Sequence, residues 1–210
     1  MRRRVFVAVL LCAGLLNACD RMPKPTRIPP EATVVAFGNS VTYGTGAASG
    51  EDWPSRLARL SGWTVVNAGV PGETAERARD RIEAVLTKYQ PALVIIEIGG
   101  NDFLQRRPQA AVKEDVRRIV QSVKQSGAQA VLVAVPQVSL LGIVSGAKSD
   151  APIYRELARE DGIPLVEAVF SEILSRPELC ADNIHPNAEG YRKMAATIYA
   201  FLAQTSKASG

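Results

Sequence analysis

Ser40 stands where a buried strand is predicted to end. The run before it, residues 33–37, is apolar and β-branched, and Gly-Asn-Ser at 38–40 leaves the strand pattern at once. Open α/β sheets bind their ligands at the carboxyl ends of the strands. Ser40 is therefore placed to act as a nucleophile, although the same three residues could simply turn the chain and cap the next helix.

His185 is the only histidine of the chain, and it follows Asp182 by three positions in the polar segment Asp-Asn-Ile-His-Pro-Asn at 182–187. A serine hydroxyl needs a base to take its proton, and an imidazole needs a carboxylate to fix its tautomer and stabilise its cation. One tight turn can bring Asp182 and His185 together. A single histidine is usually structural, but this polar loop has little packing to do, so the three residues predict a nucleophile, a base and an orienting acid.

Four blocks with candidate functional residues follow one another along the chain. They are Gly38-Asn39-Ser40, Gly72 within the segment 67–74, Asn101 within Gly-Gly-Asn-Asp at 99–102, and Asp182 with His185. Together these blocks resemble those of the SGNH (GDSL) hydrolase family. The resemblance spans roughly Thr33 to Leu202 and is greatest to the branch of bacterial thioesterases I, lysophospholipases and arylesterases. It implies a serine esterase that works without a cofactor.

The resemblance also assigns three donors to the oxyanion that forms when an ester carbonyl is attacked. They are the backbone N–H groups of Ser40 and Gly72 and the side-chain amide of Asn101. Taken alone, Gly72 could be an ordinary turn residue and Asn101 a helix cap. One departure from the family stands beside the nucleophile, where Asn39 replaces the usual Asp, which puts catalytic efficiency in doubt more than the reaction class.

The rest of the chain alternates apolar strands with amphipathic helices, a pattern typical of a parallel sheet covered on both faces. We expect a three-layer α/β/α sandwich around a five-stranded parallel sheet of flavodoxin-like order 2-1-3-4-5. This order places Ser40, after strand one, next to Asn101, after strand three. The predicted strands are 33–37, 63–67, 93–98, 130–135 and 163–166, and the predicted helices are 53–60, 73–88, a long helix with the stripe Val112, Val116, Ile119 and Val123, 153–160 and 188–202.

The N-terminus has the pattern of an export signal. Three arginines precede an apolar run at 5–16, which is of signal-peptide length, and Leu-Asn-Ala-Cys at 16–19 resembles a bacterial lipobox. We expect a signal peptide at 1–18, a lipidated Cys19 with a proline-rich, extended and unpacked tether at 19–31, and the hydrolase domain at 32–205. An ordinary cleavable signal and an uncleaved anchor are the alternatives; both also predict export.

Charge and composition exclude other classes of function. Without residues 1–18, which hold three arginines and no acid, the net charge of +4 becomes +1, so the basic precursor is no evidence for nucleic-acid binding. One histidine and no cysteine pair leave little for a metal site, and no metal is expected. Cys180 has no second histidine to activate it and is interpreted as a packing residue.

The substrate is less determined than the reaction. The apolar segment 136–146 could line an acyl pocket or belong to the core. We expect a small acyl ester or lysophospholipid as substrate and a monomeric, membrane-anchored enzyme that faces the periplasm, with a soluble periplasmic protein as the alternative. The rival functions are a carbohydrate O-acetylesterase of envelope polysaccharide and a non-catalytic binding lipoprotein.

Overall fold

A single parallel sheet forms the centre of the computed structural model, which describes residues 23–137 and 148–204. Its order is β2-β1-β3-β4-β7, so the predicted order 2-1-3-4-5 is confirmed, with β7 as the fifth strand. The five strands are β1 (Thr33–Gly38), β2 (Thr64–Gly69), β3 (Leu93–Glu97), β4 (Gln129–Val133) and β7 (Leu165–Val166).

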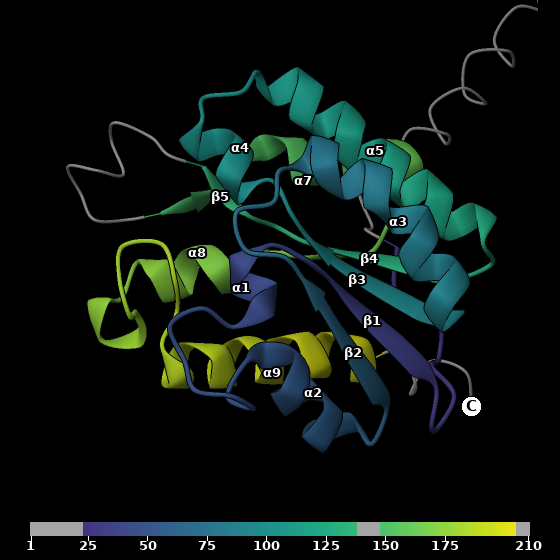
Figure 1. The fold of residues 1–210 in the computed structure, drawn as a ribbon, viewed down its shortest axis with the longest axis horizontal. Helices are drawn as coiled ribbons and strands as arrows, with labels where there is room; N and C mark the ends of the chain where they lie inside the picture. The colour runs from purple at the N-terminus through teal and green to yellow at the C-terminus, as the bar shows by residue number, and fades with distance from the viewer. Residues whose placement is uncertain (1–22, 138–147, 205–210) are drawn as a thin grey trace, which may run out of the picture.

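Helices cover both faces of the sheet and complete the predicted three layers (Figure 1). On one face lie α3 (Ala75–Tyr89), α5 (Gln109–Gln125) and α7 (Pro152–Asp161). On the other lie α2 (Trp53–Ser61) and α9 (Ala188–Ala203). The shorter helices are α1 (Ser40–Tyr43), α4 (Gly100–Leu104), α8 (Val169–Leu174) and the 3₁₀ turn η1 (Pro177–Leu179).

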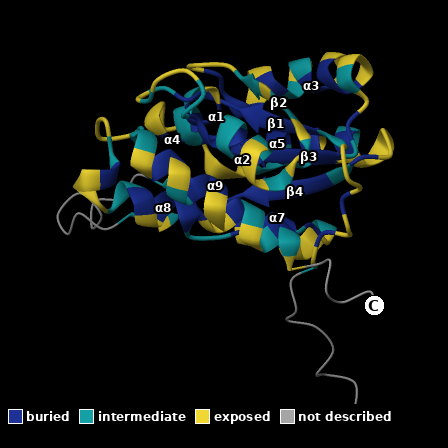
Figure 2. Ribbon diagram, turned by 90° about the horizontal axis from the view of Figure 1, so that it is seen from below, coloured by how far each residue is buried: buried dark blue, intermediate teal, exposed yellow. Residues whose placement is uncertain are grey.

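The core lies between the sheet and its helices, as the buried central strands in Figure 2 show. Every residue of β3 is buried, as expected of a strand that is covered on both faces. The edge strand β2 is only half-buried along its length. Helix ends follow local signals: the Asp52 side chain caps α2 by accepting a hydrogen bond from Ser55 N, and Gly62 ends that helix in the left-handed conformation.

The fold differs from the sequence-based expectation in several places. Helix α3 begins at Ala75 rather than at residue 73, because the Thr74 side chain caps it. A small antiparallel pair, β5 (Pro136–Gln137) with β6 (Ser149–Asp150), was not predicted. Strands of two residues are too short to show the alternation on which strand prediction depends.

The segment before β1 is more closely packed than predicted. It has no helix or strand before a turn at its end, but Pro25 and Ile28 are buried, and Thr26 N donates a hydrogen bond to Gln129 Oε1 at 2.9 Å. The expectation of an unpacked tether was therefore wrong for residues 25–28. Proline fixes the backbone of this segment, which lowers the entropy lost when it packs against the domain.

The predicted signal peptide, Cys19 and most of the apolar segment 136–146 lie outside the described residues, and these interpretations stay predictions. Within 23–137 and 148–204, no helix is both long and apolar enough to cross a membrane.

Candidate active site

Ser40 is the first residue of α1, the one-turn helix that follows β1. The chain can turn here because β1 ends in Gly38. A Cβ at that position would lie 2.1 Å from the Glu97 carbonyl oxygen and 2.3 Å from Thr42 Oγ1. The missing side chain thus lets α1 pack tightly against the end of β3, with Ser40 at the carboxyl edge of the sheet.

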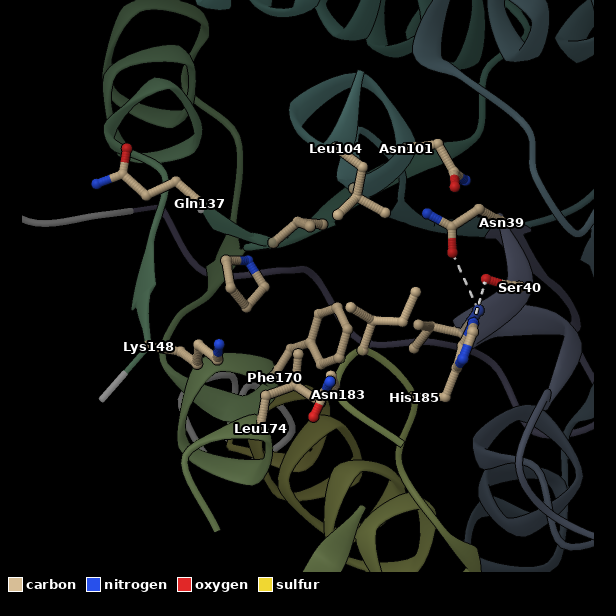
Figure 3. Close-up of a pocket in the computed structure, with 15 residues that line it drawn as sticks. Asn39, Ser40, Asn101, Leu104, Gln137, Lys148, Phe170, Leu174, Asn183 and His185 are labelled. Carbon is tan, nitrogen blue, oxygen red and sulfur yellow. Dashed lines mark hydrogen bonds between the residues drawn. The ribbon is translucent and has the colours of Figure 1, made fainter. Parts of the chain in front are cut away.

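Asp182 and His185 lie in one tight turn before α9, as predicted. Asp182 Oδ1 accepts hydrogen bonds from the backbone N–H groups of Ile184 and His185, both at 2.8 Å. Asp182 Oδ2 lies 2.8 Å from His185 Nδ1, and His185 Nε2 lies 2.9 Å from Ser40 Oγ. The structure therefore aligns the three side chains in the order carboxylate, imidazole and hydroxyl. Figure 3 shows the contact between His185 and Ser40.

The electrostatics of this line suit proton transfer. Partial burial raises the pKa of Asp182, but hydrogen bonds from the His185 ring and from two backbone N–H groups outweigh it and leave that pKa below its ordinary value. The carboxylate thus stays ionised at neutral pH. An ionised acceptor at Nδ1 favours the tautomer that carries its proton there, which leaves the lone pair of Nε2 facing Ser40.

Asn39 caps the helix that carries Ser40. Its side chain is buried, and its Oδ1 accepts a hydrogen bond from Val41 N at 3.0 Å, so it caps α1. A carboxylate oxygen accepts the same bond. The amide nitrogen of Asn39 faces Gly100, at the start of α4. Asn in place of Asp at position 39 therefore leaves the cap of α1 in place.

Asn101 lies on α4 beside Ser40, where the sheet order was expected to place it (Figure 3). Its Nδ2 donates a hydrogen bond to the backbone carbonyl of Glu73 at 2.9 Å. The residue that caps α4 is Gly99, so Asn101 is not the helix cap. An amide nitrogen carries two hydrogens, and the second is left for a ligand.

Gly72 lies in the exposed turn between β2 and α3 and has a positive φ of 76°. The positive φ favours glycine at this position. Space alone does not require it, because, outside the adjoining residues, an added Cβ would have no other heavy atom within 4 Å. Gly72 is not among the described residues that line the pocket below, and it is joined to the site through Glu73 and Asn101. The backbone N–H groups of Gly72 and Ser40 make no hydrogen bond to the part of the chain that the structure describes.

Asp102, the residue after Asn101, makes a second contact that holds the same turn. It is fully buried, and its Oδ2 accepts a hydrogen bond from Ala75 N at 2.8 Å. Its Oδ1 forms an ion pair with Arg107 at 2.6 Å, and the Arg107 guanidinium also pairs with Asp115. Two consecutive residues of α4, Asn101 and Asp102, thus hold the Gly72 turn. The signal available in the sequence was the acid two residues after the glycine pair at 99–100.

Glu97 is a further residue that sequence reasoning missed. It is fully buried at the end of β3, close behind α1, and burial raises its pKa to about 8. Its Oε1 has no hydrogen-bond partner among the described residues. The available signal was a glutamate inside an apolar strand, since charged side chains are seldom fully buried without a partner.

A pocket opens beside Ser40 and His185, with Asn39 and Asn101 at the same end (Figure 3). Pro136 and Gln137, from the segment predicted either to line an acyl pocket or to enter the core, contribute to its wall. Its apolar lining consists of Val41, Leu104, Val135, Pro136, Phe170, Leu174 and Ile184. The hydroxyl thus faces a cavity that suits an apolar group.

Known proteins share both the sequence pattern and the fold. The GDSL-like Lipase/Acylhydrolase family matches residues 36–193. The "Thioesterase 1/protease 1/lysophospholipase L1" of Escherichia coli K12 is 31% identical over 160 residues, which cover 75% of this chain and 76% of that protein. "Esterase TesA" of Pseudomonas aeruginosa is 25% identical over 196 residues, 90% of this chain and 97% of that one. A crystal structure of TesA superposes with a TM-score of 0.74 at 23% identity and covers 82% of this chain and 99% of its own.

The chain therefore belongs to the GDSL-like lipase and acylhydrolase family, as the four sequence blocks indicated. It has the α/β fold of the SGNH hydrolases. Its relatives are esterases and thioesterases, and the chain is a hydrolase of ester bonds.

Proposed function

We propose that the chain hydrolyses acyl esters through an acyl-enzyme formed on Ser40. The observation that carries this assignment is the line from Asp182 to His185 to Ser40, with contacts of 2.8 and 2.9 Å, at one end of an apolar pocket. Ser40 Oγ attacks the ester carbonyl carbon while His185 Nε2 takes its proton. The carbon–oxygen bond to the alcohol then breaks, and the alcohol leaves with the proton from His185.

Water completes the cycle. His185 takes a proton from a water molecule, the hydroxide attacks the acyl carbon, and Ser40 leaves with that proton as the carboxylic acid is released. The oxyanion of each step needs donors aimed at it in advance. The N–H groups of Ser40 and Gly72, with the second amide hydrogen of Asn101, are the donors that we assign to it.

The natural substrate that we assign is a small acyl ester or a lysophospholipid. The apolar wall formed by Leu104, Phe170 and Leu174 supports an acyl chain in the pocket. Export supports esters over cytosolic acyl-CoA thioesters, and it follows from the signal-like residues 1–18. We further propose a monomer, anchored through lipid on Cys19 to a membrane and facing the periplasm.

The test is hydrolysis of p-nitrophenyl butyrate and octanoate by the full mature chain, with EDTA present. Ser40→Ala should lose nearly all turnover, on the order of 10⁴-fold or more. A fluorophosphonate should label the wild type and not the variant. Turnover that survives in Ser40→Ala would show that another group is the nucleophile, and an inactive, unlabelled wild type would overturn the proposal.

A further inference from the structure

The pocket has two polar ends of different character. At one end lie Ser40 and His185, and at the opposite end lies Lys148, with the apolar side chains of Leu104, Phe170 and Leu174 between them (Figure 3). No aspartate or glutamate is among the described residues that line it. The far end of the pocket therefore carries a positive charge that no lining acid balances.

The position of Lys148 is held by the fold. Its backbone N–H donates a hydrogen bond to Ser175 Oγ at 2.8 Å, and that hydroxyl donates in turn to the Ser171 carbonyl at 2.7 Å. The neighbouring strand residue Asp150 makes no ion pair with Lys148: its Oδ2 accepts a hydrogen bond from Ala168 N at 2.7 Å, and its buried Oδ1 has no hydrogen-bond partner among the described residues. The backbone of Lys148 is thus held against the end of α8. Its side chain extends from there, with the amino group toward Phe170 (Figure 3).

The Lys148 ammonium has no ion-pair partner among residues 23–137 and 148–204. By contrast, Lys113 forms ion pairs with the carboxylates of both Glu156 and Glu160. An ammonium at the end of an apolar passage disfavours an apolar chain end, which would remove water from the charge without replacing its hydrogen bonds. An anionic oxygen restores those bonds and is itself stabilised by the charge.

We propose that the pocket selects esters that carry an anionic group at the end remote from the scissile bond, and that Lys148 binds this group. The inference rests on the proposed function, since it takes Ser40 as the nucleophile. The shared chemistry is a carboxylate or phosphate oxygen that is separated from the ester by a spacer of three carbon atoms. Two sources supply it: the half-ester of a dicarboxylic acid, and the phosphate of a short-chain lysophospholipid.

Two matched substrate pairs distinguish these sources. The first pair is mono-p-nitrophenyl glutarate and p-nitrophenyl pentanoate. The second is 1-hexanoyl-glycerol-3-phosphate and 1-hexanoylglycerol. The measured quantity is the ratio of kcat/KM for the anionic ester to kcat/KM for its neutral partner, which cancels general effects of a substitution on folding or on the catalytic groups.

Lys148→Met should lower this ratio by about 10-fold or more in at least one pair, the change that loss of one charge-assisted hydrogen bond produces. Lys148→Arg should retain most of the preference, because it keeps the charge. The matched control is Lys88→Met, which removes the same charge from an exposed site on α3 and should leave both ratios unchanged.

The pair that responds identifies the source of the anion. Ratios that are the same in wild type and Lys148→Met for both pairs would overturn the inference, as would an equal response to Lys88→Met. If the wild type hydrolyses the neutral esters but its ratios equal those of Lys148→Met, only the role of Lys148 is contradicted. A wild type that hydrolyses none of the four esters contradicts the proposed function itself.

Discussion

Thr42 Oγ1 lies 2.9 Å from Glu97 Oε2, and both side chains are fully buried. Thr42 belongs to α1, two residues after Ser40, so this contact joins α1 to the end of β3. Burial favours the neutral carboxyl group and raises the pKa of Glu97 to about 8. The side chain that supports α1 from behind is therefore a carboxylic acid that keeps its proton at neutral pH.

Replacement of Glu97 by glutamine should change how stability depends on pH. Between the ordinary glutamate pKa of 4.5 and about 8, the folded chain keeps this proton while the unfolded chain loses it, so wild-type stability falls as pH rises through that window. Glutamine has no proton to lose. Glu97→Gln should therefore gain stability relative to wild type as pH rises from 5 to 8, on the order of 1 kcal/mol per pH unit.

Denaturant unfolding at pH 5, 6.5 and 8 measures this difference. Glu83→Gln, at an exposed position on α3, is the matched control and should show no such trend. A constant difference in the free energy of unfolding between wild type and Glu97→Gln at all three pH values would show that Glu97 is already ionised in the folded chain.

Removal of the Asn101 amide should slow turnover more than it weakens substrate binding. We expect Asn101→Ala to lower kcat by roughly 10²- to 10³-fold, the usual loss for one oxyanion donor. Fluorophosphonate labelling should persist, because Ser40, His185 and Asp182 remain. An effect confined to KM would identify Asn101 as a substrate contact, and a lost label would show that its bond to the Glu73 carbonyl is needed to hold the site together.

Restoration of the aspartate usual in the family should be tolerated at position 39. The Asn39 oxygen caps α1 through Val41 N, and a carboxylate can accept the same hydrogen bond. Asn39→Asp should therefore preserve or raise kcat/KM on p-nitrophenyl butyrate and keep the melting temperature close to that of wild type. A large loss of activity with an intact melting curve would mean that the amide nitrogen of Asn39 has a role of its own.

The lipid anchor is tested at Cys19. Cys19→Ser should take up no radiolabelled palmitate in its host and should escape processing by the lipoprotein signal peptidase, whereas the wild type should be labelled and sediment with membranes. Pro25 is buried against the domain, and the six residues from Cys19 to Lys24 can span at most about 20 Å. A wild type that takes up no label and fractionates as a soluble protein would exclude the lipoprotein interpretation.

The sequence by itself determined the layered fold and indicated the candidate reacting groups. Alternating buried strands and amphipathic helices specify a parallel sheet, because burial follows the period of each element. The pairing of Asp182 with His185 was also readable, since residues three apart meet within one turn. Both features depend on short stretches of chain, in which the pattern of residues and the structure have the same period.

Only the tertiary structure decided which distant groups meet. Ser40 and His185 are 145 positions apart, and their 2.9 Å contact depends on how β1 and the loop before α9 are placed by the whole sheet. The bond from Asn101 to Glu73 and the position of Lys148 at the far end of the pocket have the same origin. Such contacts depend on the relative position of whole elements, and that position is set by the packing of many side chains together.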